Sequence, residues 1–387
     1  MKPEKVTIKK IVNGGYGLAH LSSGKIVLVE RALPGEKLSI DIDQVKKTHC
    51  HGSIREILVP HDSRCLPPCP FHDSCGGCDF QHCKPQFQAQ LKTTIIADLL
   101  SRNNEPSLRQ ALPLLQKTIP SPRTFGYRQR IRLQIINGEK LGFRRFRSHV
   151  PVEINRCLLA AEPLNHVLEN LPELSHFRSL AEHSSELELQ LNPDSRKVVA
   201  IFRFSRKPRP TDINNARTVC TQLDALECIF FSGDQFQLTG PFATDRNQET
   251  LLDNTLHISY NLNDNSRKPL KLQWEIGGFF QVNPEQNKTL INLVLHFSKA
   301  NPDDTVLDLF CGMGNFSIPL GQRTKEITGI EGQGSAIRSA GANSRNNGLT
   351  NTVFVKKPVH EACRQLAKEG QQFDCVVVDP PRRASRG

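Results

Sequence analysis

The stretch from Val306 to Leu320, VLDLFCGMGNFSIPL, most constrains what this 387-residue chain can fold into. Val306–Phe310 is an apolar run of the kind that forms a buried parallel strand. Cys311–Gly314 interrupts the run, and Asn315 is a residue type that caps a following helix. Glycines at such a strand-to-helix turn let a ligand approach the backbone N–H groups. The stretch therefore predicts an α/β fold with a nucleotide-binding turn.

Three more strands are expected beyond this turn, at Glu326–Ile330, Thr352–Val355 and Phe373–Val378. Glu331 follows the second strand, where an acidic residue typically holds a pair of ribose hydroxyls. The turn lacks the third glycine of a pyrophosphate-binding loop, which favours S-adenosylmethionine over a dinucleotide. The last strand runs into Asp379–Arg382, and we expect the Rossmann-like fold to be incomplete after this fourth strand.

The formal net charge of +11 favours a polyanionic partner, most simply nucleic acid. A basic surface that serves only solubility is the alternative. The chain shows neither a signal peptide nor a long apolar segment, so we expect a cytoplasmic protein with no membrane partner. Its 12 cysteines, in a reducing compartment, indicate metal binding or reactivity rather than disulfides.

The N-terminal residues 1–58 alternate short β-like runs with glycine-, serine- and proline-containing turns. The predicted strands are Val6–Val12, Lys25–Glu30, Lys37–Val45 and Gly52–Leu58. Several short strands in so few residues suggest a small β-barrel of the oligonucleotide-binding (OB) kind. The segments 13–19, NGGYGLA, and 32–36, ALPGE, resemble a TRAM domain, an RNA-binding module. A barrel without a ligand is the alternative.

Cys69, Cys75 and Cys78 lie in a loop with Gly76 and Gly77. Three thiolates this close in sequence can share a metal ion or a cluster. Structural zinc usually needs two closely spaced cysteine pairs, and this loop has one, so an iron–sulfur cluster with a distant fourth cysteine fits better. Unliganded buried thiols are the alternative. Our choice for the fourth ligand is Cys157, with Cys65, Cys83 and, less favoured, Cys50 as competitors.

The middle of the chain is expected to begin with a helix at Pro85–Asn103, with Phe87, Leu91, Ile95, Leu99 and Leu100 along one face. Residues 160–276 are expected to form an inserted α+β region. Residues 277–284, GGFFQVNP, then lead into a helix and the nucleotide fold. This organisation predicts three domains: 1–58, an RNA-binding barrel; 59–276, the cluster loop and a central α+β RNA-binding region; and 277–387, a partial cofactor-binding domain.

A β-hairpin centred on Asn137-Gly138 is expected between Tyr127 and Val152. One strand carries Arg128, Arg130 and Arg132 at a spacing of two residues, and the other begins with residues 141–147, LGFRRFR. Arginines on one face, interleaved with aromatic residues, can bind phosphates and stack on unpaired bases. The hairpin therefore predicts an RNA-binding surface, with a merely solvated charged face as the alternative.

Taken in this order, the motifs resemble those of the bacterial uracil-C5 RNA methyltransferases, specifically those that modify 23S ribosomal RNA and carry a TRAM domain and a [4Fe-4S] cluster. The motifs are the cysteine triplet with Cys157, residues 279–283 (FFQVN), 308–316 (DLFCGMGNF), 329–331 (GIE) and 379–382 (DPPR). The resemblance implies a monomer that uses S-adenosylmethionine to methylate carbon-5 of uracil in RNA, with 23S rRNA rather than DNA as its partner.

The resemblance also implies roles for individual residues. Gln281 and Asn315 would contact the cofactor, and Phe310 would lie beside it. Glu331 would hold the ribose hydroxyls, and Asp379 would lie near the methionine end and the target base. Residues 355–358, VKKP, depart from the family pattern near the adenine, so no adenine-binding residue is assigned. The cluster ligands would be Cys69, Cys75, Cys78 and Cys157.

In this family a cysteine thiolate first adds to carbon-6 of uracil, because carbon-5 alone is a poor nucleophile. In relatives this cysteine lies in a Ser-Cys-Asn-Pro segment after the fifth strand. The chain stops at Gly387, so we expect this segment and the base to be absent, and we assign no catalytic residue; Cys311 and Cys375 are not substitutes. The alternative function is a noncatalytic RNA-binding [4Fe-4S] protein. An amino-methylating site at Asp379–Arg382 is disfavoured because no aromatic residue follows the prolines.

Overall fold

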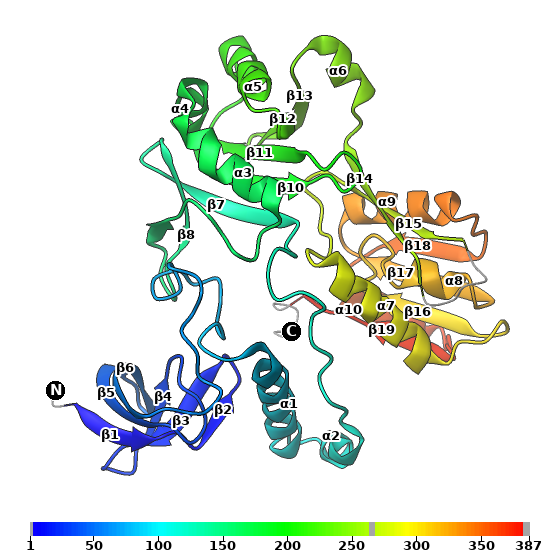
Figure 1. Cartoon of the computed structure of the whole chain (residues 1–387). Coiled ribbons are helices and arrows are strands. Elements are labelled where there is room, and N and C mark those ends of the chain that lie inside the picture. The colour runs from blue at the N-terminus through cyan, green and yellow to red at the C-terminus, as the bar shows by residue number, and fades with distance from the viewer. Residues whose placement is uncertain (1–2, 263–267, 382–387) are drawn as a thin grey trace. The chain divides into compact units, whose positions relative to one another are not determined.

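The computed structural model describes residues 3–262 and 268–381, and its fold is mixed α/β, as predicted. The chain divides into two compact units (Figure 1). The first consists of Met1–Thr124 and Phe143–Ile154, and the second of Phe125–Gly142 and Asn155–Gly387. No helix in the described part of the chain is both long and apolar enough to cross a lipid bilayer.

The first unit contains a six-stranded sheet in the order β1-β5-β6-β4-β3-β2. Its strands are β1 (Glu4–Thr7), β2 (Lys10–Val12), β3 (Tyr16–His20), β4 (Ile26–Val29), β5 (Lys37–Val45) and β6 (His49–Val59). The predicted strand Val6–Val12 is therefore divided into two, and β3 was missed. Gly17 explains the omission, because glycine suggests a turn. Here a Cβ at Gly17 would lie 2.7 Å from the Cβ of Ala32, so the glycine permits close packing inside a strand.

Helix α1 (Pro85–Ser101) confirms the predicted helix and ends slightly earlier. Leu91 is buried, and Phe87 and Ile95 pack beside it, but Leu99 is 40% exposed, so the predicted apolar face was too long. Two short helices follow, α2 (Pro106–Gln110) and the 3-10 helix η1 (Leu112–Leu114).

The second unit contains a large sheet in the order β13-β12-β11-β10-β7-β8. The strands are β7 (Arg130–Ile136), β8 (Lys140–Arg144), β10 (Ser184–Leu191), β11 (Val198–Phe204), β12 (Leu226–Gly233) and β13 (Phe236–Phe242). The last residues of β8, and β9 (Pro151–Glu153) beside it, belong to the first unit. The turn between β7 and β8 has positive φ at Asn137 (52°) and Gly138 (72°), which confirms the predicted hairpin.

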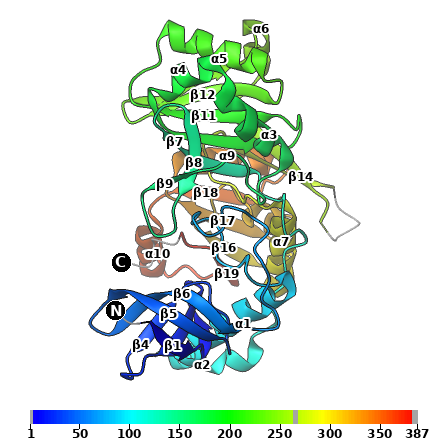
Figure 2. The same ribbon diagram turned by 60° about the vertical axis from the view of Figure 1, so that its left-hand side comes forward.

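One face of this sheet is covered by helices (Figures 1 and 2). They are α3 (Glu162–Asn170), the 3-10 helix η2 (Leu171–Glu173), α4 (Ser175–Ala181) and α5 (Pro210–Gln222); α6 (Arg246–Leu251) lies farther along the chain. Phe202 of β11 meets Phe177 of α4 with ring centroids 6.1 Å apart. Because side chains alternate along a strand, the neighbours of Phe202, Ile201 and Arg203, project from the opposite face.

Strands β14 (Thr255–Tyr260) and β15 (Leu270–Glu275) form a separate antiparallel pair. Helix α9 (Gly334–Asn346) lies along β15, and its side chains bond the strand's backbone. The side chain of Asn347, at the C-cap, accepts from the N–H of Lys271 at 3.1 Å and donates to its carbonyl at 2.7 Å. The side chain of Asn343 likewise accepts from the N–H of Gln273 at 2.7 Å and donates to its carbonyl at 2.9 Å. The backbone N–H of Glu275 donates to Ser339. These polar side chains occupy the position of a neighbouring strand.

The C-terminal sheet of this unit is wholly parallel, in the order β18-β17-β16-β19. Its strands are β16 (Thr305–Leu309), β17 (Glu326–Glu331), β18 (Thr352–Lys356) and β19 (Cys375–Val378). Helices α7 (Pro284–Ser298) and α8 (Ser317–Gly321) share one apolar cluster with β16 and β17, whereas α10 (Val359–Lys368) packs on the other face. Within the described residues β19 pairs only with β16, and Val376 and Val378 are 51% and 55% exposed.

Gly329, in the middle of β17, provides a test of this packing. A Cβ there would lie 2.6 Å from the ring of Phe354 and 3.0 Å from the sulfur of Cys311. We therefore expect Gly329→Ala to lower the free energy of unfolding by about 1–3 kcal/mol, because the ring must move. Urea unfolding monitors the change, with Gly332→Ala as the control, since nothing lies within 4 Å of a Cβ at Gly332. Equal midpoints for the two variants would contradict the packing described.

Candidate functional site

The turn after β16 has an unusual backbone. Phe310, Gly312 and Gly314 have positive φ values of 62°, 55° and 86°. A bulky residue such as Phe310 rarely adopts this conformation, and such strain is concentrated at functional sites. A Cβ at Gly314 would meet Ile318 at 2.9 Å, so this glycine is needed for packing against α8. A Cβ at Gly312 would meet nothing within 4 Å, so Gly312 borders open space that a ligand can enter.

Glu331, at the end of β17, lies directly beside this turn. Its Oε2 accepts a hydrogen bond from the N–H of Gly312 at 3.2 Å, and its Oε1 accepts one from the N–H of Gln333 at 2.9 Å. A carboxylate has about four acceptor positions, so two bonds leave capacity for a ligand. The predicted acid is thus at the carboxyl edge of the sheet, next to the open side of the turn.

The prediction that Asn315 caps a helix was wrong, because Phe316 occupies the N-cap position of α8. Its amide instead pairs with the amide of Asn287 on α7: each Nδ2 donates to the other Oδ1, at 2.8 and 3.0 Å. Asn287 also donates to the hydroxyl of Tyr260 at 3.2 Å. The buried amide of Asn287 offers both a donor and an acceptor, whereas capping would satisfy only the oxygen of Asn315.

The remaining predicted cofactor residues lie on segments around the same turn. Phe310 packs against the apolar cluster beneath α10. The backbone N–H of Asp379 is directed at the carbonyl of Leu309 at 3.5 Å, which places the exposed Asp379 beside the end of β16. Gln281 is partly buried, and its neighbour Phe280 shares an apolar cluster with residues of the turn. Arg382 lies outside the described residues.

Asp308 was missed by the sequence analysis, which treated it as part of an apolar run. It is completely buried, and its Oδ2 accepts from the hydroxyl of Ser317 at 2.5 Å. Its Oδ1 is buried with no hydrogen-bond partner in the described structure. The pKa of Asp308 is raised to about 7, mainly by burial; the bonds from Ser317 oppose the shift, and the charges of Asp379 and Glu331 add to it. A lone acid inside an otherwise apolar strand is the signal that could have found it.

The cysteine loop lies in the first unit. The N–H of Cys75 donates to the carbonyl of Phe71 at 2.7 Å, and that of Gly76 to the carbonyl of Arg144 at 3.0 Å. A Cβ at Gly76 would lie 3.0 Å from the backbone of Phe146, which explains the need for glycine here. Within 3–262 and 268–381, no three His, Cys, Asp or Glu side chains are arranged to hold a metal ion. The three loop cysteines are therefore not arranged as a metal site in the described part of the chain.

The other cysteines considered as ligands lie in different surroundings. Cys157 belongs to the second unit, where its N–H donates to the side chain of Asn165 at 2.9 Å. Cys65 and Cys83 belong to the first unit. Cys83 is buried, and burial raises the pKa of its thiol to about 11, which disfavours the thiolate that a metal ion needs.

The arginines of β7 have partners within the second unit. Arg132 donates to Glu188 on β10 through two nitrogens, at 2.9 and 2.6 Å. Arg130 donates to the carbonyl of Gly278 at 3.0 Å, and its guanidinium lies 5.0 Å from the ring centroid of Phe280. The hairpin pattern alone did not predict these partners, because they come from distant parts of the chain. An RNA-binding role for the exposed Arg145 in the first unit stays a prediction.

Comparison with known proteins agrees with this geometry. A family model described as a methyltransferase domain matches residues 300–381, the part of the chain that contains the parallel sheet and its turn. A solved structure, the tRNA (uracil-54, C5)-methyltransferase of Pyrococcus abyssi in complex with S-adenosyl-L-homocysteine, shares the fold, with a TM-score of 0.65 and 20% identity. That similarity covers 97% of this chain and 83% of the other.

Two curated relatives define the family more closely. Both are named 23S rRNA (uracil(1939)-C(5))-methyltransferase RlmD. The protein of Aeromonas hydrophila is 30% identical over 93% of this chain and 77% of its own length. That of Mannheimia succiniciproducens is 31% identical over 95% of this chain and 78% of its own length. The chain therefore belongs to the family of 23S rRNA uracil-C5 methyltransferases.

The raised pKa of Asp308 predicts a specific pH dependence of stability. Its carboxyl keeps its proton in the folded protein up to about pH 7, whereas the unfolded chain releases it near the ordinary value of 3.8. The folded state thus binds more protons between these pH values, and its stability falls as pH rises through them. Asp308→Asn should remove this contribution, with a slope of at most about 1.4 kcal/mol per pH unit.

The measurement is the difference in urea midpoint between wild type and Asp308→Asn across this pH range. The asparagine oxygen can still accept from Ser317, so the site's main bond is retained. We expect the variant to gain stability relative to wild type as pH rises. A difference that is constant with pH would show that Asp308 titrates normally.

Proposed function

We propose that this protein transfers a methyl group from S-adenosylmethionine to carbon-5 of a uracil in RNA, and that the RNA is 23S rRNA; no residue of the sequence is assigned as the nucleophile. The observation that carries the proposal is the similarity of nearly the whole chain to relatives named for this reaction. The formal net charge of +11 supports an RNA partner, because phosphate contacts supply most of the affinity in such complexes.

The cofactor supplies an electrophilic methyl group on a sulfonium. The described residues fit its binding: Gly312 borders open space, and Glu331 has acceptor capacity for a ribose diol beside it. Gln281, Phe310 and Asn315 are the further proposed cofactor residues, with Asp379 at the methionine end and near the target base. Because Asn315 is already paired with Asn287, its proposed contribution is to shape the turn.

Several finer points are part of the same proposal. The three functional divisions are residues 1–58, a TRAM-like barrel; 59–276, a cluster loop and central RNA-binding region; and 277–387, the cofactor-binding domain. The protein acts as a monomer in the cytoplasm. Support for the first division comes from the six-stranded sheet, whose strands lie between Glu4 and Val59.

Glu331→Gln tests the cofactor site. A charged acceptor for a ribose hydroxyl contributes about 1.5–3 kcal/mol, so we expect roughly tenfold or greater loss of affinity for S-adenosylhomocysteine. Isothermal titration calorimetry measures the affinity. Glu326→Gln is the matched control, since Glu326 begins the same strand and is exposed. An unchanged affinity for Glu331→Gln would remove Glu331 from the proposed site.

The reaction itself is tested by incubating the protein with 23S rRNA and methyl-labelled S-adenosylmethionine. Label recovered as 5-methyluridine supports the proposal. Label recovered only on exocyclic amines or on other nucleosides would contradict it.

We also propose a [4Fe-4S] cluster held by Cys69, Cys75, Cys78 and Cys157. The proposal rests on the number and spacing of the cysteines in a chain of this family. Among the described residues the three loop cysteines are not arranged to hold a metal ion, so cluster binding would require their side chains to move. No step of the methyl transfer is assigned to the cluster.

Metal analysis of anaerobically purified protein checks this proposal. We expect about four irons per chain, as in clusters with four cysteine ligands, and loss of iron in Cys75→Ser. Cys363→Ser, in α10, is the control. Comparing Cys157→Ser, Cys65→Ser and Cys83→Ser identifies the fourth ligand. Stoichiometric zinc without iron would rule out the cluster.

A further inference from the structure

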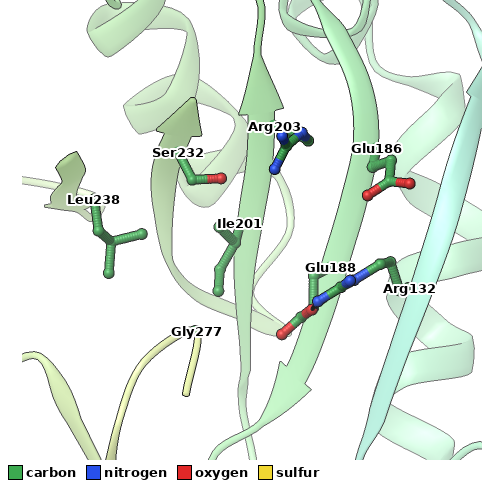
Figure 3. A pocket seen from close by; sticks show the side chains of 8 residues that line it. All are labelled: Arg132, Glu186, Glu188, Ile201, Arg203, Ser232, Leu238 and Gly277. Atoms are coloured by element: carbon green, nitrogen blue, oxygen red, sulfur yellow. Dashed lines mark hydrogen bonds and ion pairs between the residues drawn. The ribbon is translucent and has the colours of Figure 1, made fainter. Parts of the chain in front are cut away.

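The segment 277–283, GGFFQVN, lies between β15 and α7, and we call it the connecting loop. It packs on the face of the large sheet opposite the helices, because Phe280 shares one apolar cluster with Ile201 of β11 and Trp274 of β15. Gly277, at the start of the loop, also lines a hollow of about 210 Å³ on this face (Figure 3). The conformation of the loop therefore depends on the large sheet.

Arg130, the first residue of β7, is directed at the connecting loop. Its Nη1 donates to the carbonyl of Gly278 at 3.0 Å. Its guanidinium lies 5.0 Å from the ring centroid of Phe280 and 5.8 Å from that of Phe279. The side chain of Arg130 is 18% exposed, compared with 61% for Arg132 on the same strand. A cation largely withdrawn from water attracts a ring face more strongly than an exposed one does, so Arg130 can hold the loop.

The neighbouring acid, Glu188, leaves the hydrogen bond of Arg130 to the loop. Glu188 accepts two hydrogen bonds from Arg132, which lies beside it in Figure 3, and one from Gln190 at 2.6 Å. Its Oε1 is 3.9 Å from Nη1 of Arg130, which is beyond hydrogen-bond distance. Burial lowers the pKa of Arg130, and the charge of Glu188 opposes that shift. The acid thus reduces the cost of burying the guanidinium without binding it.

The ring of Phe280 has a second aromatic contact, with Trp274. The two buried rings stack with their centroids 4.3 Å apart and their planes at 21°. Such a pair contributes to stability beyond the area that it buries. Trp274 is the single tryptophan of the chain, so its fluorescence reports directly on the packing of the connecting loop.

The far end of the connecting loop is held by the backbone beside β7. The N–H of Gln129 donates to the carbonyl of Val282 at 2.9 Å. Gln281 lies between Phe280 and Val282, so both of its neighbours are held by the large sheet. Helix α7 begins directly after the loop and is bonded to the turn after β16 through Asn287.

We infer that Arg130 is a positioning residue for the cofactor site, because it holds the connecting loop in the conformation in which Gln281 contacts S-adenosylmethionine. The inference rests on the proposed function, which includes Gln281 among the cofactor residues. Arg130 acts through Gly278 and Phe280 rather than by touching the cofactor. A loop that is ordered before the ligand arrives loses less conformational freedom on binding, and the affinity is higher for that reason.

The test combines cofactor affinity with the fluorescence of Trp274 in the full chain. Isothermal titration calorimetry measures the binding of S-adenosylhomocysteine, and acrylamide quenching measures the access of solvent to Trp274. We expect Arg130→Ala to bind S-adenosylhomocysteine about tenfold more weakly, as for the loss of a hydrogen bond to a charged group. Without ligand, its Trp274 should be quenched more than in wild type. Saturating S-adenosylhomocysteine should restore the protection, because ligand binding and loop ordering are linked.

Two further variants separate the position of the loop from general stability. Arg130→Lys keeps the charge beside Glu188 and a donor for the carbonyl of Gly278, but it has no planar group to place over the ring. We expect it to fall between wild type and Arg130→Ala in affinity and in quenching; if Arg130→Ala does not fold, Arg130→Lys decides alone. Arg203→Ala is the control, because it removes an exposed guanidinium from the same sheet face, paired with an 85% exposed Asp234, and should match wild type.

The outcomes separate this inference from the proposed function. If wild type and both Arg130 variants bind S-adenosylhomocysteine equally, the inference is wrong and the proposed function is unaffected. Weaker binding with unchanged quenching of Trp274 would also overturn it, since the effect would not pass through the loop. Quenching that ligand does not reverse would show a merely structural role for Arg130. If wild type itself binds no S-adenosylhomocysteine, the proposed function fails and the inference fails with it.

Discussion

The arrangement of the second unit depends on the hydrogen bonds that α9 makes along the edge of β15. Four residues of helix advance about 6 Å and two residues of strand about 6.7 Å, so side chains at every fourth helical position can meet every second strand residue. Ser339, Asn343 and Asn347 have this spacing and bond Glu275, Gln273 and Lys271. Backbone N–H and carbonyl groups at this strand edge, which would otherwise lack partners, thereby form hydrogen bonds with side chains of the helix.

The same interaction fixes the turn after β16. The Nδ2 of Asn343 donates both to the carbonyl of Gln273 and, at 2.9 Å, to the carbonyl of Met313 within the turn. The reciprocal amide pair of Asn315 and Asn287 holds the next part of the turn against α7. Leaving such a buried group without a partner costs about 1–3 kcal/mol, so these asparagines hold Gly312 and Glu331 in a defined position. The strained backbone of Phe310 is maintained by this surrounding network.

The sequence predicted the parts of the protein that local patterns determine. Continuous apolar runs predicted the strands of the parallel sheet, and the Asn137-Gly138 pair predicted the hairpin turn. The position of Glu331 followed from its place directly after the second of these strands. The partners of polar side chains could not be predicted in this way. Asn315 pairs with Asn287, and Arg132 with Glu188, only because the fold brings distant strands and helices together. For the same reason Asp308 was taken as part of an apolar strand, since its one partner, Ser317, becomes apparent only when α8 folds back over β16.

The chain carries a net positive charge, but acidic residues gather near the turn after β16. The chain as a whole has a net charge of +11, which favours a polyanion at its surface. The turn instead has the acids Asp308, Glu331 and Asp379 near one another, and the latter two raise the pKa of Asp308. The proposed cofactor carries a sulfonium and an ammonium group, and a cation in the turn would lower that pKa again. Binding a cation in the turn and releasing the proton of Asp308 would then be linked.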